Sequence, residues 1–313
     1  NGHHIVRRGM NMMSELSTSS LLQDALSNIA ADVDQEFDTL LKMPGDTRDR
    51  LYAAMRHATI GGGKRLRPLL VTATAALFNV DRKTALRVGT AVEAIHVYSL
   101  VHDDLPCMDD DDLRRGKPTV HRAFDEATAV LAGDSLHALA FDILANPNTH
   151  SDPFVRGELV STLALASGPE GMAGGQMMDI EAENASFDLQ TVMRLQALKT
   201  GALIAASVEM GAILGHIPPE GRTHLRGYAR DIGLAFQIAD DILDVEGDPE
   251  LAGKALQKDA EAGKGTFVSL MGLDRAKQQA EMLVQQANDY LSSYGAEADL
   301  LRAIANYITE RDR

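Results

Sequence analysis

The chain has 313 residues, of which 45 % are apolar, and a formal net charge of −15. Its apolar content is enough for a sizeable core, and large single-core folds reach this length. The negative charge argues against nucleic acid as a partner, because nucleic-acid phosphates would be repelled. The single cysteine, Cys107, excludes an intramolecular disulfide and is typical of a reducing compartment, so we expect a cytoplasmic location.

The first residues do not have the pattern of a signal peptide. Segment 1–13 contains two His and two Arg but no apolar core, so we expect a tag remnant or a disordered tail. No apolar run approaches the roughly 20 residues that a membrane-spanning helix needs, so we expect no membrane span. Composition does not divide residues 14–313, and we interpret them as a single domain.

Helical periodicity dominates the chain, and strand alternation is nearly absent. Breakers such as Pro44-Gly45 and Pro218-Pro219 separate the helical segments. Segments 128–145 and 203–214 are apolar on most faces, which is typical of helices in the middle of a large bundle. The sequence therefore predicts an all-α fold. The expected helices span residues 16–41, 48–57, 66–78, 83–105, 123–145, 154–167, 171–181, 189–215, 221–246, 273–294 and 297–311.

Residues 61–68, GGGKRLRP, form a glycine-rich turn followed by three cations. Glycine allows the backbone to approach an anion closely, and Lys64 and Arg67 can bind its oxygens. The spacing is not that of a Walker A loop. The alternative interpretation is a helix-start turn with solvated basic side chains.

The first acidic pair, Asp103-Asp104, ends the helix expected over residues 83–105. Pro106 stops that helix, so both carboxylates lie in its last turn, where the helix dipole disfavours negative charge. A metal ion would supply the missing counter-charge. Asp109 can fold back towards Asp103, because the chain is loosened at Pro106.

Other side chains around this pair allow two interpretations each. His96 lies on the same helix, nearly on the face of Asp103, and is either a core residue or a ligand. Asp110–Asp112 form either a solvated surface or part of a metal site. Arg114 and Arg115 follow directly, and they either balance these acids or clamp a diphosphate, for which bidentate guanidinium geometry is suited.

The second acidic cluster, at residues 240–244, lies inside a predicted helix. Asp240 and Asp244 are one turn apart and share a face, so their charges repel unless a cation lies between them. Magnesium prefers carboxylate, water and phosphate oxygens. Few His or Cys lie beside these acids, so we do not expect zinc. The sequence therefore predicts a magnesium-binding helix.

These segments resemble the trans-prenyltransferases of the isoprenoid diphosphate synthase family, particularly the bacterial farnesyl diphosphate synthases. The resemblance covers essentially everything from about residue 20 onward. It implies a single large all-α bundle of the isoprenoid synthase type with a central cavity, a homodimer, and Mg²⁺ as cofactor, with three ions per active site. The matching segments are GGGKRLRP at 61–68, AIHVYSLVHDDLPCMDDDDLRRGKPTVH at 94–121, GGQMMDI at 174–180, LKTG at 198–201, FQIADDILDVEGD at 236–248 and GKALQKDAEAGKGTF at 253–267.

By this resemblance the chain condenses an allylic diphosphate, dimethylallyl or geranyl, with isopentenyl diphosphate and releases diphosphate. The implied Mg²⁺ ligands are Asp103, Asp104, Asp109, Asp240, Asp241 and Asp244. The implied ligands of the allylic diphosphate are Arg114, Lys199, Lys254 and Lys264, with Gln237 nearby. Those of isopentenyl diphosphate are Lys64, Arg67, His96 and Arg115. The groups expected to face the developing carbocation are the Lys199 carbonyl, the Thr200 hydroxyl and Gln237.

The length of the product should depend on the residues that precede the first aspartate motif. Tyr98 lies five positions before Asp103, hence about one turn deeper in the pocket, where a bulky ring would stop the growing chain. Its neighbour Ser99 is small. In the family, this aromatic residue together with the two-residue insertion in the motif is typical of a farnesyl-length product.

Three other functions are compatible with parts of this pattern. A geranyl or geranylgeranyl diphosphate synthase differs only in product length. A terpene cyclase would need a second metal motif of the type NDxxSxxxE. Asn288-Asp289 with Ser292 comes close to that motif, but Ala296 occupies its acidic position. A regulatory subunit of a prenyl synthase usually lacks one aspartate motif, whereas both are intact here.

Overall fold

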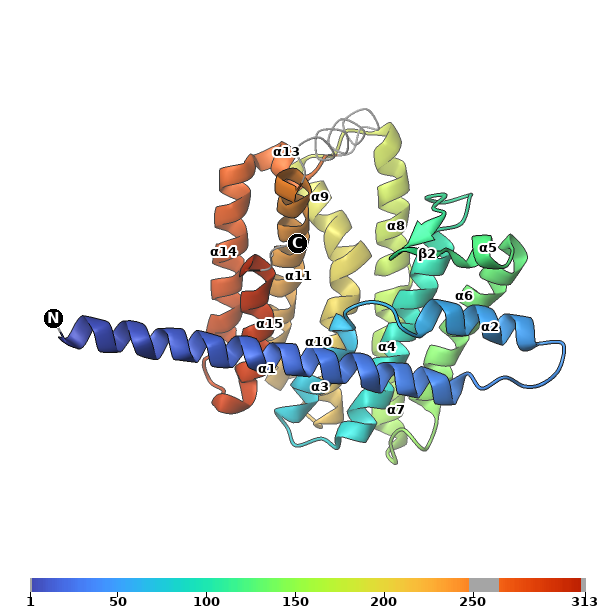
Figure 1. Cartoon of the computed structure of the whole chain (residues 1–313), viewed down its shortest axis with the longest axis horizontal. Coiled ribbons are helices and arrows are strands. Elements are labelled where there is room, and N and C mark those ends of the chain that lie inside the picture. Colours follow the sequence, from blue (N-terminus) through green and yellow to red (C-terminus); the bar gives the residue numbers. More distant parts are fainter. Residues whose placement is uncertain (1, 248–264, 311–313) are drawn as a thin grey trace. The chain divides into compact units, whose positions relative to one another are not determined.

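The computed structural model describes residues 2–247 and 265–310, with side chains from residue 20 onward. Its elements are almost all helices, which confirms the predicted all-α fold (Figure 1). The longer helices are α1 (Gly2–Leu40), α2 (Asp49–Thr59), α3 (Leu66–Ala76), α4 (Arg82–Asp103), α6 (Glu126–Ala145), α7 (Pro153–Ser167), α8 (Met172–Glu181), α9 (Leu189–Gln196), α10 (Ala202–Leu214), α11 (Thr223–Gly247), α14 (Leu273–Tyr290) and α15 (Asp299–Glu310). Shorter elements are the strands β1 (Leu113–Arg114) and β2 (Lys117–Pro118), the helices α5 (Val120–Ala123) and α13 (Phe267–Met271), the 3-10 turns η1 (Ala182–Asn184), η3 (Pro219–Arg222) and η4 (Ala296–Ala298), and the π-helix η2 (Ala197–Gly201).

The helices form two compact units. The unit that we call the first unit comprises residues 23–161 and 213–216. The second unit comprises residues 1–22, 162–212 and 217–313. That residues 14–313 form one domain stays a prediction.

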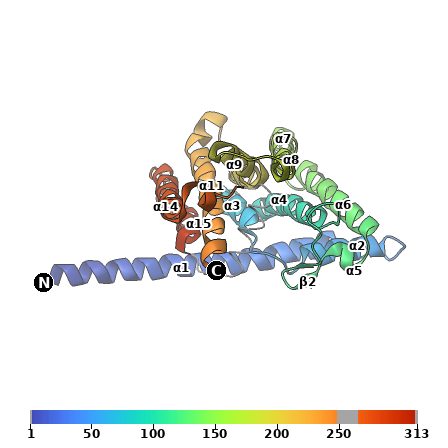
Figure 2. The same ribbon diagram turned by 90° about the horizontal axis from the view of Figure 1, so that it is seen from above.

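In the first unit, α4 and α6 lie side by side (Figure 1 and Figure 2). Each begins at an aspartate whose side chain accepts a backbone hydrogen bond, Asp81 for α4 and Asp125 for α6. Gly133 lets the two helices approach, because a Cβ at this position would lie 2.1 Å from Nε2 of His102. The helix that ends in the first aspartate pair is therefore held rigidly against its neighbour.

In the second unit, α11 packs against α14 and α15. A Cβ at Gly227 of α11 would lie 2.5 Å from the ring of Tyr290 on α14, so only glycine allows this close approach. The hydroxyl of the fully buried Tyr228 donates to the carbonyl of Leu301, 2.6 Å away, at α15. These contacts hold the helix that carries the second aspartate motif.

Most predicted helices are present with somewhat different ends, and several details were not predicted. The first helix begins at Gly2, whereas we expected it to begin at residue 16. The helix expected over residues 189–215 is divided into α9 and α10 by the π-helix η2. The antiparallel strands β1 and β2, which pair Arg114 with Lys117, and the short helix α13 were also missed.

The expectation that no apolar segment approaches the length of a membrane-spanning helix was wrong. Among the described residues, Glu126–Ala145 and Leu189–Leu214 are long and apolar enough to cross a membrane by length and composition alone. This is weak evidence for membrane insertion, because core helices of globular proteins have the same properties. The absence of a membrane span stays a prediction.

Candidate active site

The glycine-rich turn of the first unit is shaped to receive a guanidinium group. Gly61 and Gly63 have φ values of +81° and +77°, a region that favours glycine. A Cβ at Gly62 or at Gly63 would lie 3.0 Å from a terminal guanidinium nitrogen of Arg115. Arg115 therefore lies directly over the glycine backbone, although it follows it by about fifty residues in the chain.

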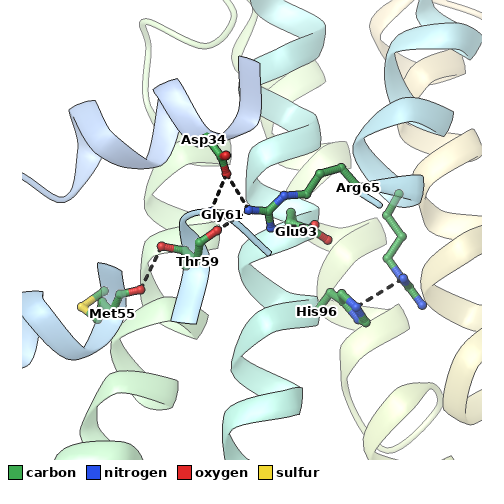
Figure 3. A network of polar contacts seen from close by, with 8 residues as sticks. Asp34, Met55, Thr59, Gly61, Arg65, Glu93 and His96 are labelled. Atoms are coloured by element: carbon green, nitrogen blue, oxygen red, sulfur yellow. Dashed lines mark hydrogen bonds and ion pairs between the residues drawn. The ribbon is translucent and has the colours of Figure 1, made fainter. Parts of the chain in front are cut away.

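Arg65, in the middle of this motif, has a structural role. It is 3 % exposed, and its guanidinium forms ion pairs with Asp34 at 2.9 Å and with Glu93 at 3.0 Å (Figure 3). The same group also donates to the carbonyl of Thr59. Since two carboxylates balance its charge and both terminal nitrogens donate hydrogen bonds, Arg65 is an anchor between helices and is not directed at a ligand.

Arg67, two residues later, lies in a different environment. One of its terminal nitrogens lies 3.5 Å from Nε2 of His96, and its buried Nε has no hydrogen-bond partner. Burial lowers the pKa of Arg67; the charge of Glu93 opposes this effect, and that of Arg115 adds to it. An arginine nevertheless remains charged, because its pKa starts far above neutrality.

His96 is neutral at the centre of this group. Burial, followed by the positive charges of Arg67 and Arg115, holds the pKa of His96 well below its ordinary value. Burial and the charge of Arg114 likewise lower the pKa of Arg115. Arg67 and His96 are half-buried and Arg115 is exposed, so an anion can reach this excess of positive charge and would relieve it. Arg67, His96 and Arg115 are called the cation cluster below.

A small cleft of about 70 Å³ adjoins the cation cluster. It is lined by residues of the glycine turn, of α4 and of the β1–β2 hairpin. They include Gly61, Gly62, Asp104, Arg114, Arg115 and Lys117. Three cations around one cleft are suited to binding an anion with several oxygens.

The first aspartate motif folds back as predicted. Asp103 is the last residue of α4, and the backbone N–H of Asp109 donates to the carbonyl of Asp103 at 2.8 Å. Asp104 is buried, and its two carboxylate oxygens accept hydrogen bonds from Nε and Nη2 of Arg114 at 2.9 and 2.8 Å. The structure therefore brings Asp103 and Asp109 together and couples Asp104 to a predicted diphosphate ligand.

The acids that follow this motif are exposed, and two of them lie beside a histidine. Among the described residues, Asp110, Asp112 and His121 place their ligand atoms within 4.8 Å of one another, a grouping that could hold a metal ion. Carboxylate oxygens are ligands for hard divalent cations. The sequence pattern left the role of Asp110–Asp112 open and did not indicate a role for His121.

Tyr98, the residue expected to limit product length, is half-buried on α4. Its ring stacks on His137 of α6 with centroids 4.6 Å apart, and His137 in turn contacts Phe141 at 5.5 Å. Burial, then the charge of Asp103, raises the pKa of Tyr98, so its hydroxyl stays protonated. The small neighbour Ser99 donates to the carbonyl of His96 at 2.6 Å.

In the second unit, the predicted residues Lys199 and Thr200 lie in the π-helix η2. Such one-turn π segments inside α-helices are frequent at functional sites. The ammonium of Lys199 forms an ion pair with Asp179 of α8 at 2.7 Å. Gly175 of α8 packs against the same segment, where a Cβ would lie 2.2 Å from the backbone nitrogen of Lys199. Nothing in the sequence pattern indicated that Gly175 supports this π-helix.

The second aspartate motif lies on α11. The backbone N–H of Phe267 donates to a carboxylate oxygen of Asp241 at 2.7 Å, which ties the motif to the start of α13. Gln237, one turn before the motif, lines a largely apolar cavity of about 430 Å³ together with Gly201 and Gly233. Cavities of this size and character bind small organic ligands.

Not every predicted residue can be placed. Lys254 and Lys264 lie outside the described residues, as does most of the lysine-bearing loop at 253–267. The two aspartate motifs belong to different units, so the joint binding of Mg²⁺ by Asp103 and Asp240 stays a prediction.

Comparison with known proteins supplies the family. The family model of polyprenyl synthetases matches residues 48–305. The chain belongs to the polyprenyl synthetase family. The chain is 44 % identical over 271 residues to farnesyl diphosphate synthase of Bacillus subtilis (strain 168), with 85 % of this chain and 90 % of the relative covered.

Other members of the family differ in the product that their names state. The chain is 44 % identical over 264 residues to a chloroplastic geranylgeranyl pyrophosphate synthase of Capsicum annuum, covering 84 % of this chain and 72 % of the relative. It is also similar to the crystal structure of an FPP/GFPP synthase from Zymomonas mobilis, with a TM-score of 0.85, 57 % identity, and 93 % and 99 % of the two chains covered.

Proposed function

We propose that this chain is a magnesium-dependent prenyltransferase that condenses dimethylallyl or geranyl diphosphate with isopentenyl diphosphate and forms farnesyl diphosphate. The observation that carries the proposal is the cation cluster. Arg67, Arg115 and the neutral His96 lie together with unbalanced positive charge and an unused buried donor. A diphosphate supplies the charge and the acceptor oxygens that this place lacks.

The acidic residues fit Mg²⁺, because their donor atoms are hard carboxylate oxygens. Asp103 and Asp109 are linked through their backbones, and Asp240 and Asp244 are one turn apart on α11. Asp104 accepts hydrogen bonds from Arg114, and Asp241 accepts one from the backbone of Phe267; such contacts orient both carboxylates for metal binding. The proposed number of ions is three per active site with the allylic diphosphate bound.

In the proposed reaction, the C–O bond of the allylic diphosphate breaks and the isopentenyl double bond attacks the carbocation. A proton is then lost to the departing diphosphate, since no side-chain base is evident. Bound Mg²⁺ supplies stabilisation of the negative charge that grows on the leaving group. The carboxylates would position the metal ions, and they do not take protons themselves.

The basic residues divide into two proposed sets. Lys64, Arg67, His96 and Arg115 hold isopentenyl diphosphate, and Arg114, Lys199, Lys254 and Lys264 grip the allylic diphosphate. The ion pairs Arg114–Asp104 and Lys199–Asp179 support the second set, because they orient both cations before the substrate arrives. The Lys199 carbonyl, the Thr200 hydroxyl and Gln237 face the carbocation, and apolar lining keeps water away from it.

The proposed product length rests on Tyr98 and Ser99. The stacking of Tyr98 on His137 supports this role, because a ring that packs against a neighbour resists displacement by the growing chain better than a free ring does. A geranylgeranyl product is the second candidate, since a relative with that name is as similar to this chain as a farnesyl diphosphate synthase. We further propose a cytoplasmic homodimer.

Incubation of the protein with Mg²⁺, isopentenyl diphosphate and either allylic substrate, followed by product sizing, tests the proposal. We expect a C15 product that disappears when EDTA removes the metal. Turnover of geranyl or farnesyl diphosphate in the absence of isopentenyl diphosphate would instead indicate a terpene cyclase. No product under any of these conditions would contradict the proposed activity.

A further inference from the structure

The base of the β1–β2 hairpin gathers three side chains that the proposed reaction does not use. Asp110 and Asp112 precede β1, and His121 follows β2 on the short helix α5. Their ligand atoms, two carboxylate oxygens and one imidazole nitrogen, all lie within 4.8 Å of one another. The hairpin between them carries Arg114 and Arg115.

His121 is the unusual member of this group. It is only 7 % exposed, and neither of its ring nitrogens has a hydrogen-bond partner. A buried polar group without a partner costs free energy, and natural proteins rarely leave one in this state. One ring nitrogen lies close to both carboxylates but forms no hydrogen bond with them. Side chains arranged in this way have room for an ion between them.

The spacing of the three ligands fits a metal ion. Ligand atoms at about 2.1 Å from an ion lie at most about 4.2 Å apart across it, so the group needs only a small contraction to bind one. The backbone holds the group in place, since Thr119 N–H donates to the carbonyl of Asp112 at 3.0 Å. Arg122 donates to a carboxylate oxygen of Asp112 at 2.6 Å, as partners of metal-binding carboxylates commonly do.

The geometry points to a divalent cation of the Zn²⁺ type bound by Asp110, Asp112 and His121, separate from the Mg²⁺ of the two aspartate motifs. An imidazole nitrogen together with carboxylates favours Zn²⁺ or a similar transition-metal ion, whereas Mg²⁺ prefers oxygen ligands alone. The bound ion closes the base of the hairpin. It thereby holds Arg114 and Arg115 in position at the small cleft that adjoins the cation cluster.

A titration of the metal-stripped full-length protein with Co²⁺, in buffer saturated with Mg²⁺, tests the site. Co²⁺ stands in for Zn²⁺ and is followed by its visible absorption. We expect one equivalent bound by the wild-type protein that His121→Gln and Asp110→Asn each lose or bind at least about tenfold more weakly. Asp110 has a φ of +53°, a conformation that Asn tolerates well, so this exposed substitution preserves the fold even where His121→Gln does not.

The matched control is Asp111→Asn, which changes the acid between the two proposed ligands but lies outside the group. We expect Asp111→Asn to bind Co²⁺ as the wild-type protein does. We expect the same of Asp103→Asn, because Asp103 also lies outside the group. Unchanged Co²⁺ binding in His121→Gln and Asp110→Asn would overturn the proposal, and so would equal loss in Asp111→Asn. No substrate is present, so the result is independent of whether the prenyltransferase activity is confirmed.

Discussion

Arg67 and Arg115 of the first unit differ from Lys199 of the second unit in how their charges are balanced. In the first unit, Arg67 and Arg115 lie near each other and near other arginines, and burial together with like charge lowers the pKa of both. In the second unit, the ammonium of Lys199 is paired with Asp179 at 2.7 Å. The first arrangement is incomplete without an anion, whereas the second is already neutralised.

This difference suggests that the cation cluster and Lys199 have different roles. An unbalanced cation cluster gains most from a ligand that brings its own negative charge, such as isopentenyl diphosphate. A paired lysine on a π-helix contributes through position, because its partner fixes the backbone that carries Thr200 and the Lys199 carbonyl. Substitutions in each place should therefore have different kinetic effects.

The largest expected effect comes from the aspartate motifs, one in each unit. Asp103→Asn and Asp240→Asn should each lower kcat by roughly a hundred- to a thousandfold, because each removes a charge that places Mg²⁺ on the leaving group. The double variant should fall little further, since the two residues act in one step. Steady-state assays at saturating Mg²⁺ measure this. Fully additive losses would contradict a shared metal site.

Next in size is the contrast between the neighbouring arginines Arg65 and Arg67. Arg65→Ala leaves Glu93 buried without its partner and should lower the free energy of unfolding by about 3–5 kcal/mol. Arg67→Ala should change that free energy by less than about 1 kcal/mol, because Arg67 is desolvated without an ion pair of this kind. Urea denaturation measures both. Arg67→Ala should instead raise KM for isopentenyl diphosphate about ten- to a hundredfold.

Equal destabilisation by the two substitutions would show that Arg67 is also a structural anchor. In that case the cation cluster would lose its main member, and the contrast with Lys199 would disappear.

Gly175→Ala tests whether activity depends on the position of the π-helix η2, which carries Lys199 and Thr200. The new methyl group would overlap the backbone of Lys199, so the π-helix must shift. We expect kcat to fall roughly ten- to a hundredfold with the Lys199–Asp179 pair chemically intact. Gly157→Ala is the control, because nothing lies within 4 Å of a Cβ at that helical position. Normal kinetics in Gly175→Ala would mean that the geometry of η2 is unimportant.

The neutral state of His96 predicts a pH effect on stability. Its pKa is lowered in the folded protein, so the unfolded chain binds more protons below about pH 6.5. Stability should therefore fall as the pH decreases through that value, by at most about 1.4 kcal/mol per pH unit from this residue. Urea denaturation of the wild-type protein and His96→Gln between about pH 7 and about pH 5.5 measures the difference. Identical slopes would contradict the burial of His96 among cations.

The smallest expected effect concerns the product. Tyr98→Ala should shift the product distribution beyond C15, because the stop in the pocket is removed. His137→Ala should produce a weaker shift in the same direction, since it only supports the ring. Phe154→Ala, on a side chain that is 86 % exposed, is the control and should leave the distribution unchanged. Chromatography of the dephosphorylated products measures all three, and an unchanged C15 output from Tyr98→Ala would remove Tyr98 from this role.

Much of the fold was predictable, because helix periodicity and helix breakers are local signals. The helix expected over residues 83–105 is α4 at Arg82–Asp103, and Pro106 follows its end as expected. The π-helix η2 was not predictable in this way. It forms where α8 packs against the segment through Gly175, a contact between residues far apart in sequence. The grouping of His121 with Asp110 and Asp112 was missed for a similar reason, because the β1–β2 hairpin brings them together.

The sequence by itself determined the all-helical class, the two aspartate motifs and the family, since these depend on residue type and spacing. It could not distinguish the roles of Arg65 and Arg67, which lie two positions apart in one motif. Tertiary structure decided this, because Asp34 and Glu93, from other helices, neutralise Arg65 and leave Arg67 beside a neutral histidine. The charge balance of a buried cation is set by partners that folding brings close, and its own neighbours in the chain do not reveal them.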